Sequence, residues 1–188
     1  MQAIRSAAAV FAEKGFHGSS TKDIAERLGI KQGSLYYYFK SKEEALGEVC
    51  LFGIEDYVHR MEDIAASDQP FEAKLAATVT SHLSSYRERN EALKVHNNER
   101  LYLPAERRKK LKQLGSQYRR KLEGIFEAGK RDGLLRPSLD CHFAAQAVIG
   151  LCNAWGDIIV RDTDVSIADV AQKCTDLLLG GMVCRNKN

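Results

Sequence analysis

The sequence predicts an all-α protein. Apolar residues recur at intervals of three and four along the chain, which is the helical period, and no long stretch alternates with the period of two that is typical of strands. The three prolines, Pro70, Pro104 and Pro137, fall between these periodic segments, where first-turn or linker positions are expected. With 188 residues, 44% of them hydrophobic, the chain is long enough for one sizeable core or two modest ones.

The first 47 residues predict three short helices. An apolar stripe predicts the first helix, which ends at Gly15, and its members are Ile4, Ala7, Ala8 and Phe11. The second helix should span residues 21–28, with Ser20 or Thr21 as N-cap and Gly29 as its end, and the third should span 32–39. We therefore expect a small basic domain at residues 1–47 and a larger one at 48–188.

The rest of the chain predicts longer helices. Ser41 and Glu44 form a capping-box pattern, which starts a fourth helix that runs to about residue 66 and connects the two domains. Further helices are expected near residues 70–89, 91–101, 104–132, 140–161 and 166–184. Ser166 and Asp169 form an aspartate version of the capping box at the start of the last one.

Composition excludes several classes of protein. The sequence has neither a run of about 18 apolar residues nor a secretory signal, so we expect a cytoplasmic protein without a membrane partner. The five cysteines contain no C-x-x-C pair, which predicts small buried hydrophobes rather than disulfides or zinc ligands; they are Cys50, Cys141, Cys152, Cys174 and Cys184. Phosphate-binding loops, nucleophile elbows and histidines with ligand spacing are also missing, so we expect neither an enzyme nor a cofactor or metal.

Residues 18–42 carry the most informative pattern. A helix of about two turns, a tight turn at Gly29 and a second short helix have the spacing of a helix-turn-helix, whose second helix can lie in the major groove of DNA. The positions expected to face inward are apolar: Ile24, Ala25, Leu28, Ile30, Leu35 and Phe39. The alternative is a pair of short helices that only makes a packing corner.

Five polar or aromatic residues remain on the outer face: Lys31, Gln32, Ser34, Tyr37 and Tyr38. Gln32 can form two hydrogen bonds with an adenine edge, and Ser34 can reach several base edges. Lys31 and Lys42 would meet phosphate or guanine, while helix-start amides with Thr21 and Ser41 suit phosphate. Each basic residue taken singly can equally be a solvated side chain.

The segment from Gly18 to Leu46 resembles the DNA-binding signature of the tetracycline-repressor (TetR) family. The likeness is carried by Gly-x-Leu-Tyr-x-x-Phe at 33–39 and Ser-Lys-Glu-Glu at 41–44. The resemblance implies DNA contacts at Thr21, Lys22, Lys31, Gln32, Ser34, Tyr36, Tyr37, Tyr38 and Lys42. Two features depart from the family pattern: Lys31 replaces the frequent serine cap, and Met1 already falls on the first helix, where many members carry a preceding polar or basic segment.

The same resemblance implies a helical effector-binding and dimerisation domain at 48–188. Residues 140–161 and 166–184 would pack against their copies in a homodimer, although an intramolecular core would explain their apolar faces equally well. Effector contacts are expected from residues that combine apolar bodies with polar anchors: Met61, His82, Tyr86, His96, Asn97, Tyr118, Phe126, Asn153 and Trp155.

Residues 103–155 are similar to family members that sense acyl-coenzyme A. Residues 104–131 carry ten basic and three acidic residues, and Arg107, Arg108 or Arg119 could meet the phosphates of such a ligand. The alternative for this block is a solvated helix face. We therefore expect a repressor that releases operator DNA when a small molecule, an acyl-CoA or another largely apolar compound, binds. An architectural DNA-binding protein is the other alternative, and the acidic 48–103 segment argues against it.

Overall fold

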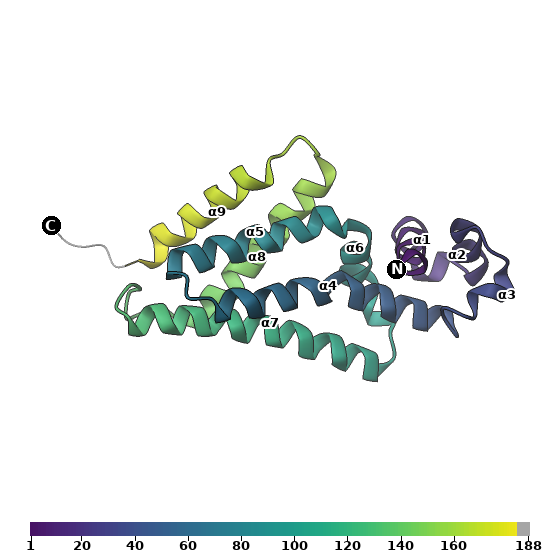
Figure 1. Ribbon diagram of the computed structural model, residues 1–188, viewed down its shortest axis with the longest axis horizontal. Helices are drawn as coiled ribbons and strands as arrows, with labels where there is room; N and C mark the ends of the chain where they lie inside the picture. Colours follow the sequence, from purple (N-terminus) through teal and green to yellow (C-terminus); the bar gives the residue numbers. More distant parts are fainter. Residues whose placement is uncertain (184–188) are drawn as a thin grey trace. The chain divides into compact units, whose positions relative to one another are not determined.

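The computed structural model describes residues 1–183, and within them every regular element is a helix (Figure 1). One isolated antiparallel bridge joins Leu135 and Val183. The predicted all-α class is therefore confirmed.

The helices form two compact units. The N-terminal unit contains α1 (Gln2–Gly18), α2 (Thr21–Leu28), α3 (Gln32–Leu35), the first part of α4 (Lys42–Ala66), α6 (Asn90–Glu99), the 3-10 turn η1 (Arg100–Tyr102) and the first part of α7 (Ala105–Arg131). The C-terminal unit contains the remainder of α4 and of α7, with α5 (Phe71–Glu88), α8 (Cys141–Arg161) and α9 (Ile167–Met182).

The predicted helices are present, with two differences in extent. The first helix was expected to end at Gly15, where φ is +70°, but α1 continues beyond this kink to Gly18. The third helix was expected over residues 32–39, but only Gln32–Leu35 is α-helical and residues 36–38 continue as turns. The N-cap Lys31 supplies no side-chain hydrogen bond, and Gly33 disfavours a helix interior, so a second helical turn is poorly supported. Residue 184, the expected end of the last helix, and the predicted buried Cys184 lie outside the described residues.

The core of the N-terminal unit forms where α1 packs against α2 and α6. Phe11, Ile24 and Leu46 are fully buried there. Two further contacts tie α6 to α1: Lys94 Nζ donates to the Ala12 carbonyl at 3.0 Å, and the Glu99 carboxylate accepts from the Phe16 amide at 3.3 Å. Residues 89–115 thus pack with the N-terminal helices. The predicted division into a DNA-binding domain at 1–47 and an effector-binding domain at 48–188 stays a prediction.

The core of the C-terminal unit forms around α5, which packs against α8 and α9 (Figure 1). Met61, Leu83 and Phe126 are fully buried there. Gly156 of α8 lies directly under the ring of Tyr86, because a Cβ atom added at Gly156 would be 2.4 Å from that ring. A glycine at this position therefore lets the two helices approach closely enough for the tyrosine to lie between them.

Of the cysteines expected to be buried hydrophobes, Cys50, Cys152 and Cys174 are buried and Cys141 is half-buried. Burial raises the pKa of the Cys50 and Cys152 thiols to about 12, so both are uncharged at neutral pH.

Candidate functional site

The N-terminus of α2 is fixed by a reciprocal capping box. The Ser20 hydroxyl accepts from the Asp23 amide at 3.2 Å, and the Asp23 carboxylate accepts from the Ser20 amide at 2.7 Å. A salt bridge from Lys14 and the bonds from Ser20 lower the pKa of Asp23. The sequence indicated Ser20 or Thr21 as the cap; the reciprocal role of Asp23 was not predicted, although serine followed three residues later by an acid signals it.

The turn after α2 is built on Gly29, which has φ +76° and ψ +28°. The Gly29 amide donates to the Glu26 carbonyl at 3.1 Å, and the Ile30 amide donates to the Ala25 carbonyl at 3.0 Å. These two bonds close a Schellman motif, whose left-handed residue is most easily a glycine. The predicted tight turn is confirmed, and it brings α3 against α2.

The outer face of α3 and its following turn is an aromatic and polar surface. Tyr37 is 88% exposed, Tyr36 56% and Tyr38 51%, whereas Leu35 and Phe39 are buried beneath them. The residues predicted to contact DNA on this face are all exposed: Lys31, Gln32, Ser34, Tyr36, Tyr37 and Tyr38. We call these six residues the α3 surface.

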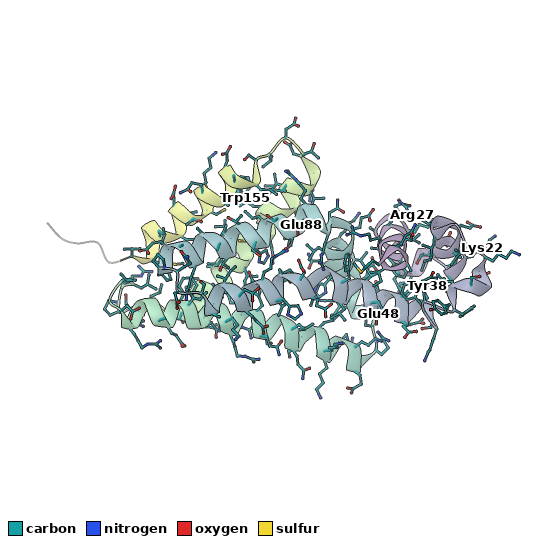
Figure 2. The ribbon with its side chains drawn as sticks, viewed as in Figure 1. Lys22, Arg27, Tyr38, Glu48, Glu88 and Trp155 are labelled. Atoms are coloured by element: carbon teal, nitrogen blue, oxygen red, sulfur yellow. The ribbon has the colours of Figure 1, made fainter. Side chains whose placement is uncertain are left out.

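The α3 surface is held to α2 by one polar contact. Gln32 Nε2 donates to Thr21 Oγ1 at 3.1 Å, so two residues predicted to contact DNA are bonded to each other in the free chain. Lys22 extends from α2 and is exposed, with Glu26 as an ion-pair partner at 3.7 Å (Figure 2). Such an exposed pair is worth little and leaves the ammonium available to another anion.

Lys42 differs from the other predicted DNA contacts. Its ammonium donates to the carbonyls of Phe16, at 2.8 Å, and Ser19, at 2.9 Å, and lies 4.4 Å from the centre of the Phe16 ring. The side chain therefore ties the start of α4 to the turn between α1 and α2.

The predicted capping box at the start of α4 is half correct. The Ser41 hydroxyl accepts from the Glu44 amide at 3.1 Å, as expected. The Glu44 carboxylate bonds the Lys40 amide instead of the Ser41 amide, so it reaches one residue further back than in a standard box.

Four of the predicted effector residues form one hydrogen-bonded cluster in the C-terminal unit. His82 contacts Tyr118 Oη through Nδ1 and Asn153 Oδ1 through Nε2, each at 3.0 Å. Tyr86 Oη donates to the same Asn153 oxygen at 2.9 Å. We call His82, Tyr86, Tyr118 and Asn153 the polar cluster. It joins α5, α7 and α8.

His82, Tyr86 and Tyr118 of the polar cluster are buried, Asn153 is exposed, and the cluster is electrically neutral. Burial lowers the pKa of His82 to about 4, and burial raises the pKa of Tyr118 well above its ordinary value. Tyr57 of α4 adds a ring that stacks on His82, with centroids 5.4 Å apart, and meets Tyr118 edge-on. Tyr57 was not among the predicted effector residues, although it lies four residues before Met61 on α4, where the two share a helix face.

The other predicted effector residues divide between the two units. Met61 and Phe126 are buried in the C-terminal unit, and Trp155 is half-buried there. His96 and Asn97 instead belong to the N-terminal unit, where Asn97 is exposed. His96 bonds the backbone of Cys50, and burial, with Arg100 nearby, lowers its pKa to about 4. The structure therefore does not bring these two residues together with the polar cluster.

The basic block at 104–131 is likewise divided. Arg107 pairs with Glu48 at 3.3 Å in the N-terminal unit, and Arg108 donates to a backbone carbonyl there. Arg119 contacts Glu123 at 3.4 Å in the C-terminal unit. All three arginines suggested for ligand phosphates thus have protein partners.

An open groove of about 380 Å³ lies in the C-terminal unit between the end of α4, the start of α5 and α7. Its apolar wall includes Phe71 and Ile125. Its charged residues are Lys74, whose ammonium donates to the Ala65 carbonyl at 3.0 Å, with Arg120, Lys121 and one acid, Asp132. None of the nine predicted effector residues lines it. An apolar wall with several cations suits a molecule that is apolar along its length and anionic at one end.

Two family models match consecutive parts of the chain. Residues 3–49 match the model of the family described as bacterial regulatory proteins, tetR family, and residues 68–182 match a tetracyclin repressor-like C-terminal domain. The chain belongs to the TetR family of bacterial transcriptional regulators. Curated relatives of this regulator include the HTH-type transcriptional repressor KstR2 of Rhodococcus jostii, with 31% identity over 94% of this chain and 87% of the relative.

The fatty acid metabolism regulator protein of Bacillus subtilis is 27% identical to this TetR-family regulator and covers 97% of this chain and 94% of its own. Among solved structures, PfmR from Thermus thermophilus aligns with a TM-score of 0.88 and 26% identity, over 95% of this chain and 97% of its own. FadR from Bacillus subtilis in complex with stearoyl-CoA aligns with a TM-score of 0.79 and 27% identity, over 96% of this chain and 98% of its own. Members of this family are regulators of transcription.

This TetR-family regulator exposes large apolar side chains on its last two helices. Phe143 of α8 is 72% exposed and Leu177 of α9 is 68% exposed, and Ile158 of α8 is also exposed. By length and composition, α8 is apolar enough to cross a membrane, yet only a third of its most apolar window is buried within the chain. Exposed apolar side chains gathered in one patch are typical of surfaces that contact another molecule.

Proposed function

We propose that this chain is an effector-responsive repressor that binds operator DNA as a homodimer in the cytoplasm. The exposed α3 surface is the observation that supports the proposal most strongly. It presents an amide that can pair with adenine, a hydroxyl and aromatic rings, and it follows the turn built on Gly29. Lys22 and Lys31 add positive charge for the phosphate backbone. Lys42 would act by positioning the α1–α2 turn, since its ammonium already has three partners.

A second copy of the chain is the partner that best suits the exposed faces of α8 and α9. Phe143, Ile158 and Leu177 would be buried against their counterparts, and family members typically dimerise through helices of their C-terminal domains. To read a palindrome from one side, such a dimer would need its two α3 surfaces about 34 Å apart, which is one helical turn of DNA.

The proposed effector is a long-chain acyl thioester. Two observations support this class: the apolar groove contains Lys74, Arg120 and Lys121, and a structural relative was solved with stearoyl-CoA. Effector binding would shift α4, which contributes to both units, and so change the separation of the two α3 surfaces. A coupling free energy of about 1–3 kcal/mol would weaken DNA binding about five- to 150-fold.

Operator binding with and without effector tests this proposal. A palindrome selected from random DNA with the purified chain is labelled, and its affinity is measured by fluorescence anisotropy at several salt concentrations. Stearoyl-CoA should weaken operator binding, whereas coenzyme A alone should not. Unchanged affinity at saturating stearoyl-CoA would exclude this effector, and equal affinity for random DNA would favour an architectural protein.

A further inference from the structure

Asn153 of α8 is a surface residue whose side chain also bonds residues of the core. The residue as a whole is exposed, yet its side-chain oxygen accepts two hydrogen bonds inside the C-terminal unit, from His82 Nε2 at 3.0 Å and Tyr86 Oη at 2.9 Å. Both donors come from α5, four residues apart, where side chains share a face. Two donors of one helix therefore converge on a single carbonyl oxygen that another helix supplies.

The direction of these bonds follows from the chemistry of the groups. A neutral imidazole has one donor and one acceptor nitrogen, and His82 is neutral because burial lowers its pKa to about 4. An amide oxygen only accepts, so the hydrogen of His82 is assigned to Nε2. Nδ1 then accepts from the Tyr118 hydroxyl at 3.0 Å. The Asn153 oxygen thus assigns Nε2 as the donor nitrogen of His82, and the Tyr118 hydroxyl, which can donate or accept, is compatible with that assignment.

The two donors are also held in place independently of Asn153. Tyr57 stacks on the His82 ring, and the Tyr86 ring lies against the backbone of Gly156. If the Asn153 side chain turned toward solvent, His82 Nε2 and Tyr86 Oη would still point at the position that its oxygen had occupied.

We propose that the position of Asn153 Oδ1 is a binding site for the carbonyl oxygen of the effector, occupied in the free chain by the protein's own amide. On binding, the effector's carbonyl accepts the two bonds from His82 and Tyr86, and the Asn153 amide turns out to water. Every buried donor stays satisfied before and after this exchange, so the swap avoids the penalty of an unpaired polar group. The inference rests on the proposed function and adds a contact region outside the groove, because no residue of the polar cluster lines that groove.

The site favours a neutral carbonyl, as in a thioester or ketone, over a carboxylate. Both donors are uncharged, so a carboxylate would bring a negative charge into a part-buried position where neither donor neutralises it. Arg60 is the cation that influences Tyr118, but its guanidinium bonds Ser81 at 2.9 Å and Glu88 at 3.3 Å.

A pair of probes that differ only in the carbonyl tests the site. Stearoyl-CoA carries the thioester carbonyl, and S-octadecyl-CoA replaces it with a methylene group. Binding of both is measured by calorimetry to the full chain and to Asn153→Ala, Tyr86→Phe and Gln146→Ala. Gln146→Ala serves as the control, because Gln146 is exposed on the same helix. Circular dichroism confirms that each variant is folded.

Asn153→Ala removes the competing amide, so stearoyl-CoA should bind it about two- to tenfold more tightly than wild type, with S-octadecyl-CoA unchanged. Tyr86→Phe removes one donor and should reduce the preference for the thioester by a similar factor. Gln146→Ala should alter neither affinity.

If the two probes bound every protein with equal affinity, the carbonyl site would be refuted, but the proposal that the effector is an acyl thioester would not. The site would also be overturned if Asn153→Ala changed both affinities equally. If neither probe bound any of the proteins, both the effector class and the site would be refuted. The predicted pattern of affinities without any loss of operator binding would support the site and contradict the proposed release mechanism.

Discussion

The α3 surface and the polar cluster are specified in different ways. The helices that present the α3 surface are held by short-range bonds, such as that between Ser20 and Asp23, three residues apart. The polar cluster joins His82 to Tyr118 and Asn153, which are 36 and 71 residues away. The first region is thus encoded by a continuous segment, whereas the second exists only after several helices have packed. This contrast explains why one short motif predicts DNA binding but no comparable motif predicts the effector.

The largest effect should follow from a large-to-small substitution in the core of the C-terminal unit. Phe126 is fully buried in the C-terminal unit, and Phe126→Ala should lower the free energy of unfolding by about 3–5 kcal/mol, because it leaves a cavity. Urea denaturation measures the change. Tyr37→Ala is the matched control in the α3 surface, where an 88% exposed ring should change stability by less than about 0.5 kcal/mol. A similar loss of stability in both variants would contradict the proposed difference between the two regions.

Acid should destabilise both units through buried neutral histidines. Burial lowers the pKa of His82 and of His96 from 6.5 to about 4 in the folded chain. Between these values the unfolded chain binds more protons, so stability is full above pH 6.5 and falls as the pH drops toward 4. Each histidine accounts for roughly 3 kcal/mol of this fall.

Unfolding free energies measured between pH 8 and pH 4 test the role of the two histidines. His82→Gln and His96→Gln should each have a smaller decrease in stability over this range than the wild-type chain, and the double variant the smallest. A wild-type pH dependence retained in both single variants would show that other groups cause the fall.

Substitutions in the α3 surface should change DNA affinity rather than the free energy of unfolding. Gln32→Ala removes the side chain proposed to read an adenine edge and should weaken operator binding by about 1–3 kcal/mol, while binding to random DNA is nearly unchanged. Anisotropy titrations with both DNAs measure this specificity. The same variant loses the bond to Thr21, which is exposed and should contribute little to folding. An equal loss on random DNA would indicate a phosphate contact.

The smallest effect should come from the cap that holds α2. Ser20→Ala removes the acceptor for the Asp23 amide and should cost about 1 kcal/mol of stability. Ser138→Ala, in an exposed turn, is the control and should be neutral within about 0.5 kcal/mol. Amide hydrogen exchange should place the Ser20→Ala loss in α2, and faster exchange confined to other helices would contradict the assignment.

The sequence by itself determined the helices, most of their ends and the α3 surface. Ser20, Gly29 and the apolar positions around Leu35 act on neighbours a few residues away, so their consequences can be read from spacing. The exceptions are informative. The short α3 and the Glu44 bond to Lys40 depend on competition between local hydrogen bonds of similar energy, which spacing does not rank.

Tertiary structure alone decided which of the predicted effector residues meet. His82 and His96 are both histidines on helices, yet one joins Asn153 across the C-terminal unit and the other packs against Cys50 in the N-terminal unit. Packing also decided that the Lys42 ammonium lies beside two backbone carbonyls, while its predicted contact with DNA stays a prediction. Helical periodicity gives the face on which a side chain lies, but the partner of that face is fixed by how helices distant in sequence pack together.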